Sequence, residues 1–163
     1  MLRIGAELPE PKVAVAPAKA AEPEAAPRAS VQKLTLYTDG ASRGNPGPAS
    51  IGVMIKDASG KVVDTIARAI GRQTNNIAEY AAVLAGLSRA KELGAQQVLL
   101  RADSELAIRQ LTGVYKVKNE GLRPIFDAVK RLERSFPGGV RYEHVRREYN
   151  QEADALANQA LDG

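Results

Sequence analysis

The period of the hydrophobic pattern changes after residue 70, and this change constrains the fold more than any other feature. Between residues 33 and 70, apolar and polar side chains alternate, which is the period of β-strands. From Ile77 to Leu93, apolar side chains recur every three or four residues, which is the period of an amphipathic helix. The sequence therefore predicts a domain that begins with strands, and its first helix follows them.

The alternating part divides into strands joined by short connections. Gly and Pro are frequent in residues 40–48, and a turn signal covers residues 57–60. Connections this short predict antiparallel hairpins. We expect strands at residues 33–39, 51–55 and 61–70.

The remainder of the chain alternates between helices and strands. The apolar run at residues 98–100 is typical of a strand that is buried on both faces. Hairpin-linked strands followed by alternating strands and helices predict a mixed α/β sheet. We expect helices at residues 77–93, at 104–111 and from 124, strands at 97–103 and 140–147, and a last helix capped by Asn150.

The first 32 residues differ in composition from the rest. Ala and Pro supply 14 of the first 30 residues, and the spaced prolines prevent a long helix. The segment offers little apolar surface to offset the entropy lost on ordering. We expect a disordered Ala/Pro-rich leader at residues 1–32 and one folded domain at residues 33–163. The leader is interpreted as a functionless tail, with a tether to a partner as the alternative.

Composition excludes several classes of site. The chain has no Cys, which excludes disulfides, thiolate zinc sites, iron–sulfur clusters and a Cys nucleophile. It has one His, which excludes a multi-His centre, so a metal must be bound mainly by oxygen, as Mg²⁺ and Mn²⁺ are. The net charge of +4 is compatible with nucleic-acid binding.

The amino-acid sequence shows no pattern typical of a membrane segment or of a targeting signal. No stretch approaches the roughly 20 apolar residues that a membrane-spanning helix needs. Glu7 and Glu10 interrupt the start of the chain, which argues against a secretory signal, and the leader's acids argue against a transit peptide. We expect a cytoplasmic protein without a membrane segment.

Four acidic residues occupy positions that local structure aims toward one edge of the sheet. Asp39 and Asp103 end predicted strands, where ligand sites of α/β sheets form. Glu79 lies in the predicted first turn of one helix, and Asp154 lies near the start of the last. Four carboxylates gathered there repel one another unless cations share the site. Two divalent ions can activate water and stabilise a leaving oxygen in phosphodiester cleavage.

Taken singly, each acid also has a structural explanation. Asp39 can shape a turn, and Asp103 can cap the helix that starts at Ser104. Glu79 and Asp154 can complement helix dipoles. The argument for function rests on the four acids together with the residues around them.

The four acids lie in motifs that resemble those of the type 1 ribonuclease H family. Residues 37–47 (YTDGASRGNPG) resemble its opening motif, and residues 74–80 (TNNIAEY) resemble its glutamate motif. Residues 102–106 (ADSEL) resemble the motif of the third acid, and residues 150–158 (NQEADALAN) that of the last. The motifs occur in family order, and the resemblance leaves out the leader.

The resemblance implies a ribonuclease H-like α/β fold, with a five-stranded mixed sheet in the order 3-2-1-4-5 flanked by helices. It implies an endoribonuclease that hydrolyses the RNA strand of RNA–DNA hybrids with two Mg²⁺ or Mn²⁺ ions, leaving 5′-phosphate and 3′-hydroxyl ends. By motif, Asp39 bridges both ions and Asp154 holds the ion that activates water. Glu79 and Asp103 hold the ion at the leaving oxygen.

The chain departs from the family at the catalytic-loop His that many members place before the last acid. Its only His, His144, alternates with Val140 and Tyr142 in a predicted strand, so we interpret it as a strand residue. The segment before Asp154 resembles a His-lacking subgroup in which an Arg matching Arg147 takes a comparable position. A guanidinium is no general base at neutral pH, but it can stabilise phosphate charge or assist product departure. The alternative for Arg147 is an exposed loop residue.

Neutral polar groups near the acids suit recognition of the RNA 2′-hydroxyl, which both donates and accepts hydrogen bonds. The resemblance places them at minor-groove contacts, while their structural explanation is loop formation. Arg43, and Lys116 with Lys118, are expected to contact phosphates without reading sequence, with a solvated loop as the alternative for the two lysines. The substrate-binding residues that we expect are Gly40, Ser42, Arg43, Asn45, Asn75 and Asn76.

Two further departures concern the substrate. Some members carry a basic helical protrusion after the second helix, whereas only residues 113–121 connect the helices here, which implies a weaker grip on the hybrid. Glu105 stands where the family often has Gln, and an acid beside phosphates is unfavourable, so we assign it no substrate role.

Two alternatives to a hybrid-cleaving nuclease remain. One is a non-catalytic RNA–DNA hybrid-binding module with the same fold, against which the four acids argue because negative charge repels phosphates. The other is a related nuclease with additional activity on double-stranded RNA. We expect the protein to act as a monomer.

Overall fold

The structure, a computed structural model, describes residues 32–163. The leader expected at residues 1–32 lies outside this part, except for its last residue, Gln32. The backbone carbonyl of Gln32 accepts hydrogen bonds from the amides of Gln96 and Gln97, at 2.8 Å each. Gln32 therefore already belongs to the folded part.

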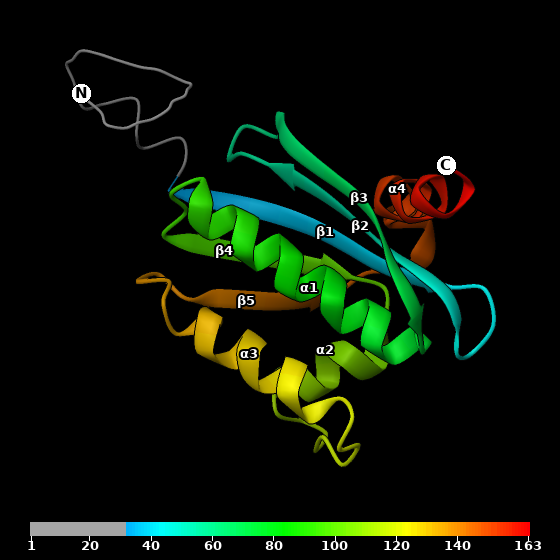
Figure 1. Cartoon of the computed structure of the whole chain (residues 1–163). Helices are drawn as coiled ribbons and strands as arrows, with labels where there is room; N and C mark the ends of the chain where they lie inside the picture. Colours follow the sequence, from blue (N-terminus) through cyan, green and yellow to red (C-terminus); the bar gives the residue numbers. More distant parts are fainter. Residues whose placement is uncertain (1–31) are drawn as a thin grey trace. The chain divides into compact units, whose positions relative to one another are not determined.

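One mixed sheet of five strands organises residues 32–163 (Figure 1). The strand order is β3-β2-β1-β4-β5, which confirms the order that the family resemblance implies. The strands are β1 (Lys33–Ser42), β2 (Gly47–Lys56), β3 (Val62–Gln73), β4 (Gln97–Ala102) and β5 (Val140–His144).

Strand β1 lies at the centre of the sheet and joins its two halves. It is antiparallel to β2 and parallel to β4, with Tyr37 opposite Met54 on one side and Arg101 on the other. The predicted hairpins between β1, β2 and β3 are confirmed. The parallel pairing of β1 with β4 ends at Thr38 and Ala102, so the residues that follow these two, Asp39 and Asp103, lie at the same level, where ligand sites of α/β sheets form.

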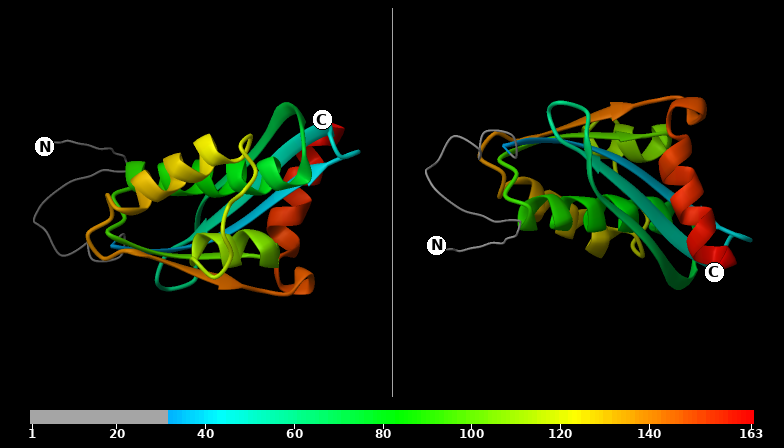
Figure 2. Two further views of the ribbon diagram at one scale, coloured as in Figure 1. Left: turned by 90° about the horizontal axis from the view of Figure 1, so that it is seen from below. Right: turned by 90° about the horizontal axis from the view of Figure 1, so that it is seen from above.

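Helices cover the two faces of the sheet unequally (Figures 1 and 2). Helix α1 packs on β1 and β2, and α3 packs on α1. Helix α4 packs across β1, β2 and β3 from the opposite face. No helix within residues 32–163 is long and apolar enough to cross a membrane. The helices are α1 (Asn75–Glu92), α2 (Glu105–Leu111), α3 (Arg123–Glu133) and α4 (Gln151–Asp162).

The core fills the space between α1 and the sheet. Leu34 and Leu36, which alternate along β1 as predicted, are fully buried, and Leu36 contacts the helix at Gly86. Leu87 of α1 is buried in the same cluster. Burying each such Leu side chain contributes about 1.5–3 kcal/mol, so this layer fixes how α1 lies on β1.

Strand β1 is longer than the alternation predicts. Its pairing with β2 continues from Asp39 through Ser42, which lies opposite Ala49. The expected loop at residues 40–48 is therefore reduced to residues 43–46. The prediction was wrong because a hydrogen-bonded ladder uses backbone groups, which Gly40 supplies as well as any residue. Asp39 consequently lies inside a strand, and β3 likewise runs on to Gln73.

Helix α1 begins two residues before the expected start at Ile77. Thr74 is the N-cap, and its side-chain oxygen accepts a hydrogen bond from the Ile77 amide at 3.2 Å. Glu79 therefore lies in the second turn, and the expectation of a first-turn position was wrong. The apolar pattern could not show the true start, because the first two helical residues are asparagines.

The segment before α4 also differs from the prediction. Strand β5 ends at His144, three residues earlier than expected, and Arg147–Tyr149 forms a 3₁₀ turn. Asn150 occupies the N-cap position of α4, but its side chain makes no capping hydrogen bond. The predicted N-cap position is confirmed, but the side chain is oriented by its Nδ2, which donates to groups on β1 and after β4.

Two glycines let helices approach the sheet closely from opposite faces. A Cβ at Gly40 would lie 2.2 Å from the carbonyl carbon of Ala78 in α1. A Cβ at Gly52 would lie 2.1 Å from the carbonyl oxygen of Ala153 in α4. Asp39 precedes Gly40 in the chain and lies opposite Gly52 in the sheet, so both helices reach β1 at the level of Asp39.

We expect Gly52→Ala to destabilise the protein, because the added methyl group has no room between β2 and the α4 backbone. Overpacking costs about 1–3 kcal/mol, and contact with backbone atoms limits relaxation. Urea unfolding followed by circular dichroism measures the free energy of unfolding. Gly121→Ala is the control, because a Cβ there meets only the side-chain oxygen of Asn119, at 3.2 Å. Equal unfolding free energies for the two variants would contradict the close packing of α4.

Candidate active site

Four carboxylates from four elements meet at the sheet edge formed by the ends of β1 and β4. Asp39 lies in β1, and Asp103 directly follows β4. Glu79 comes from α1 and Asp154 from α4. Carboxylate oxygens of Asp39, Glu79 and Asp103 lie within 4.8 Å of one another, and the charge of Asp154 raises the pKa of Asp39, which places Asp154 beside this group. The structure therefore brings together all four acids that the sequence singled out.

The geometry removes most of the structural explanations for the single acids. Asp39 shapes no turn, because it lies inside β1. Asp103 does not cap α2, because the Ser104 side chain accepts the hydrogen bond from the Ala107 amide. Glu79 lies beyond the first turn of its helix. Only Asp154 has a first-turn position that complements a helix dipole.

Three of the carboxylates accept a hydrogen bond from an uncharged amide. Such donors orient a carboxylate and leave its charge available to a cation. The three pairs are the Gly40 backbone amide with Oε1 of Glu79 (3.3 Å), Nδ2 of Asn150 with Oδ2 of Asp103 (3.1 Å) and Nδ2 of Asn158 with Oδ1 of Asp154 (3.3 Å).

Burial and mutual repulsion oppose ionisation of the cluster. Desolvation, the charge of Asp103 and the hydrogen bond and charge of Asp154 raise the pKa of Asp39 to about 8. Burial, followed by the charges of Asp39 and Asp103, holds the pKa of Glu79 well above its usual range. A bound cation favours the charged form of such acids, and carboxylate oxygens are the ligands that Mg²⁺ and Mn²⁺ prefer. The cluster is therefore compatible with divalent metal.

Arg147 is the cation that acts on this cluster. It lies in the 3₁₀ turn before α4, and its charge lowers the pKa of both Asp39 and Glu79. Its side chain is exposed, so a phosphate can reach it. His144 is exposed at the end of β5 and is not among the groups whose charges shift either acid. The charge of Arg147, unlike His144, therefore acts on two of the four acids.

The loop between β1 and β2 is tied to the start of α1. Oδ1 of Asn45 accepts a hydrogen bond from the Asn75 backbone amide at 3.0 Å. The Ser42 hydroxyl donates to the carbonyl of Gln73 at 2.9 Å, just before the helix. These contacts place Gly40, Ser42, Asn45, Asn75 and Asn76 around the helix turn that precedes Glu79.

The residues that we expect to bind phosphates have exposed side chains. A terminal guanidinium nitrogen of Arg43 forms an ion pair of 2.7 Å with Asp162 at the end of α4, and both side chains are exposed. An exposed ion pair of this kind contributes little, so a phosphate can replace the carboxylate. Lys116 and Lys118 are exposed in the connection between α2 and α3, outside the group around Glu79.

Sequence reasoning missed three contributions to the site. Gly52 lets α4 reach the strand, and a glycine within an alternating strand is a usable signal of close backbone approach. Asn158 lay in the last motif without an assigned role. Asn150 was expected only as a cap, since an asparagine before a helix has that role more often than any other.

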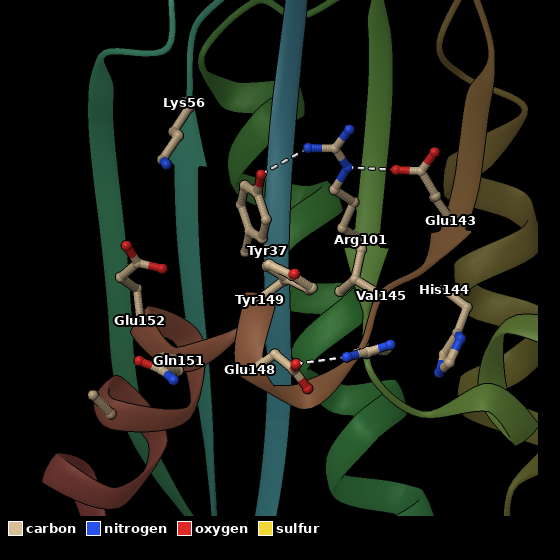
Figure 3. Close-up of a pocket in the computed structure, with 12 residues that line it drawn as sticks. Tyr37, Lys56, Arg101, Glu143, His144, Val145, Glu148, Tyr149, Gln151 and Glu152 are labelled. Atoms are coloured by element: carbon tan, nitrogen blue, oxygen red, sulfur yellow. Dashed lines mark hydrogen bonds and ion pairs between the residues drawn. The ribbon is translucent and has the colours of Figure 1, made fainter.

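A separate hollow of about 870 Å³ lies on the sheet face that α4 leaves open (Figure 3). None of the four carboxylates lines it. Two ion pairs join four of its charged groups, Arg101 with Glu143 at 2.5 Å and Arg146 with Glu148 at 2.8 Å. Arg101 also donates to the Tyr37 hydroxyl at 2.7 Å. The hollow is therefore distinct from the candidate active site.

Comparison with known proteins agrees with this geometry. Residues 37–160 match a family described as reverse transcriptase-like. Ribonuclease HI of Halobacterium salinarum is 44% identical over 130 residues, which cover 80% of this chain and 65% of that protein. The crystal structure of RNase H1 from the same archaeon matches with a TM-score of 0.77 at 42% identity, covering 80% of this chain and 98% of the other. The chain belongs to the type 1 ribonuclease H family.

A further type 1 ribonuclease H was solved in complex with an RNA/DNA hybrid. This protein, LC11-RNase H1 from compost, matches with a TM-score of 0.75 at 40% identity, covering 79% of this chain and 96% of the other. The chain spans only part of several curated relatives that it matches. It covers 65% of the Halobacterium protein and 36% of a bifunctional protein of Mycobacterium tuberculosis.

We expect the stability of the metal-free protein to fall as pH rises. Between its ordinary pKa of 3.8 and its folded pKa of about 8, Asp39 holds a proton that the unfolded chain releases. Stability from this proton is fully present below about pH 4 and is lost as pH rises through about 8. Thermal melts in EDTA across this range measure the slope. Asp39→Asn does not titrate and should flatten it, whereas equal slopes would contradict the raised pKa.

Proposed function

We propose that this member of the ribonuclease H family is an endonuclease that hydrolyses the RNA strand of RNA–DNA hybrids. The observation that carries the proposal is the convergence of four partly buried carboxylates at one sheet edge. A module that only bound nucleic acid would be weakened by this charge, because carboxylates repel phosphates. The relatives named ribonuclease HI and RNase H1, one of them in complex with a hybrid, support the same activity.

We propose that the cluster holds two divalent ions, Mg²⁺ or Mn²⁺. The residues fit such ions, because three acids present oxygen atoms within 4.8 Å and Asp39 needs a cation to ionise at neutral pH. When bound, such a pair of ions activates water and stabilises the leaving oxygen, which gives 5′-phosphate and 3′-hydroxyl ends.

The pattern of contacts supports a division of roles among the acids. The charges of Asp103 and Asp154 both act on Asp39, so it is the acid that would contact both ions. Glu79 interacts with Asp39 and Asp103. We therefore assign Glu79 and Asp103 to the ion at the leaving oxygen and Asp154 to the ion on the side of the attacking water.

Substrate recognition is assigned to the group beside Glu79. Its backbone amides and asparagine side chains are uncharged donors and acceptors, which suits the 2′-hydroxyl that distinguishes RNA from DNA. Arg43 is assigned to a phosphate, in exchange for its exposed partner Asp162. The proposed substrate-binding residues are Gly40, Ser42, Arg43, Asn45, Asn75 and Asn76.

Arg147 is assigned to a phosphate at the reacting centre. It is exposed and its charge reaches Asp39 and Glu79, so it is placed to stabilise charge that develops on the scissile phosphate. One chain supplies all of these groups, which supports action as a monomer. We place the activity in the cytoplasm.

A panel of labelled duplexes tests the proposal. RNA–DNA, RNA–RNA and DNA–DNA duplexes are incubated with the protein in Mg²⁺, Mn²⁺ or EDTA, and the ends of the products are mapped. We expect cleavage of the RNA in the hybrid with either metal and none in EDTA. Binding of the hybrid without cleavage would instead indicate the non-catalytic module, and equal cleavage of RNA–RNA would indicate the broader nuclease.

We expect Asp103→Asn to keep the fold and to remove most of the cleavage. The change is nearly isosteric but removes a negatively charged metal ligand. Binding of the hybrid should persist or strengthen, since repulsion of phosphate falls. Single-turnover cleavage and fluorescence anisotropy with a labelled hybrid measure the two properties. Near-normal turnover in a folded variant would contradict the assignment of Asp103.

Arg147→Ala should lower turnover by roughly 10–100-fold if the guanidinium stabilises developing charge. Arg147→Lys should recover only part of this, because an ammonium cannot reproduce the guanidinium fork. The matched control is His144→Ala, for which we expect unchanged pH dependence of cleavage. Turnover is measured at saturating Mg²⁺ from mildly acidic to mildly alkaline pH. If Arg147→Ala cleaved at the wild-type rate while a folded His144→Ala did not cleave, the two assignments would be reversed.

A further inference from the structure

The side chain of Asn150 is fully buried at the junction of three elements. It lies just before α4, with an exposed fraction of 0%. Its Nδ2 donates to the backbone carbonyl of Thr38 at 2.9 Å, one residue before Asp39, and to Oδ2 of Asp103 at 3.1 Å. One amide group thus connects the start of α4, the central strand and one of the four carboxylates.

Helix stability does not explain this arrangement. An asparagine at an N-cap ordinarily accepts a hydrogen bond from an amide of the first turn, and this contact stabilises the helix. Asn150 occupies that position, yet its side chain makes no such contact. The amide has turned away from the helix that it precedes.

The oxygen of the same amide is left without a partner. Oδ1 of Asn150 is buried and makes no hydrogen bond within residues 32–163. A buried acceptor without a donor lowers stability. Exchanging the two ends of the amide would not help, because Oδ1 would then face two acceptors, the Thr38 carbonyl and the Asp103 carboxylate. The two donor contacts therefore fix which way the amide points.

We propose that Asn150 is a positioning residue that holds the Asp103 carboxylate in the orientation in which it binds a divalent ion. The inference rests on the metal site assigned under the proposed function. An amide suits this task because it donates without bringing charge. An aspartate there would add a fifth carboxylate to the cluster, and an arginine would compete with the metal for Asp103. The same amide holds α4, and hence Asp154, against the strand that carries Asp39.

A double-mutant cycle tests the proposal without measuring activity. Asn150→Ala is made alone and in combination with Asp103→Asn, and Mg²⁺ binding to the nucleic-acid-free protein is measured by titration calorimetry. We expect the single change to weaken Mg²⁺ affinity by about 10-fold or more, which is typical for a lost partner of a metal ligand. In the Asp103→Asn background the same change should have almost no effect on Mg²⁺ affinity. Asn150→Leu keeps more of the side-chain volume and should weaken Mg²⁺ binding as Asn150→Ala does. It replaces the alanine variant if that variant does not fold.

Gln110→Leu is the matched control. Gln110 is a buried amide whose Oε1 accepts a hydrogen bond from the Tyr80 hydroxyl at 2.8 Å, and it contacts none of the four carboxylates. We expect this variant to melt at a lower temperature and to bind Mg²⁺ as the wild type does. It shows what loss of a buried amide does when no metal ligand is involved.

The outcomes separate the inference from the function on which it rests. An Asn150 variant that melts earlier but binds Mg²⁺ like the wild type would overturn the positioning role. If Asn150→Ala weakened Mg²⁺ affinity equally in the Asp103→Asn background, Asn150 would not act by orienting Asp103. A folded wild type that binds no Mg²⁺ would overturn the metal site itself, and with it the inference.

Discussion

Repulsion among carboxylates held together at one sheet edge is the constraint on which the rest of this structure depends. Burial and the neighbouring acids raise the pKa of Asp39 to about 8, so the metal-free cluster resists full ionisation near neutral pH. A protein that served stability alone would separate these acids or pair each of them with a cation. Here the side chain of Arg147 is exposed. The hydrogen bonds to Glu79 and Asp103 come from uncharged amides. The arrangement favours a site that divalent ions complete.

Close backbone packing is what brings the acids together. Asp39 is carried by the central strand, and Gly40 and Gly52 allow α1 and α4 to reach that strand from opposite faces. Glu79 and Asp154 arrive with those two helices. The parallel pairing of β1 with β4 adds Asp103 from the same sheet edge. Three of the acids are thus fixed by packing of a whole element and Asp103 by the end of β4, which makes the cluster more rigid than one built on long loops.

Uncharged hydrogen-bond donors orient the carboxylates that the packing of the strands and helices brings together. The Gly40 amide, Asn150 and Asn158 each hold one carboxylate. Asn150 does so while its own oxygen is buried and accepts no hydrogen bond from the part of the chain that the structure describes. The hollow on the open sheet face differs from the site, because the charged groups around it mainly form ion pairs with one another (Figure 3).

The sequence alone determined the strand and helix types, the identity of the four acids and, through the motif resemblance, the strand order, because these follow from local periodicity and short patterns. It misplaced the end of β1 at Asp39 and the start of α1 at Ile77, since backbone pairing and capping by Thr74 leave no apolar signal. Only the tertiary structure decided that Asn150 faces Asp103 instead of its own helix. The reason is physical: a side chain's local preference yields to a long-range acceptor, and residues 47 positions apart in the chain become neighbours only through the packing of β1, β4 and α4.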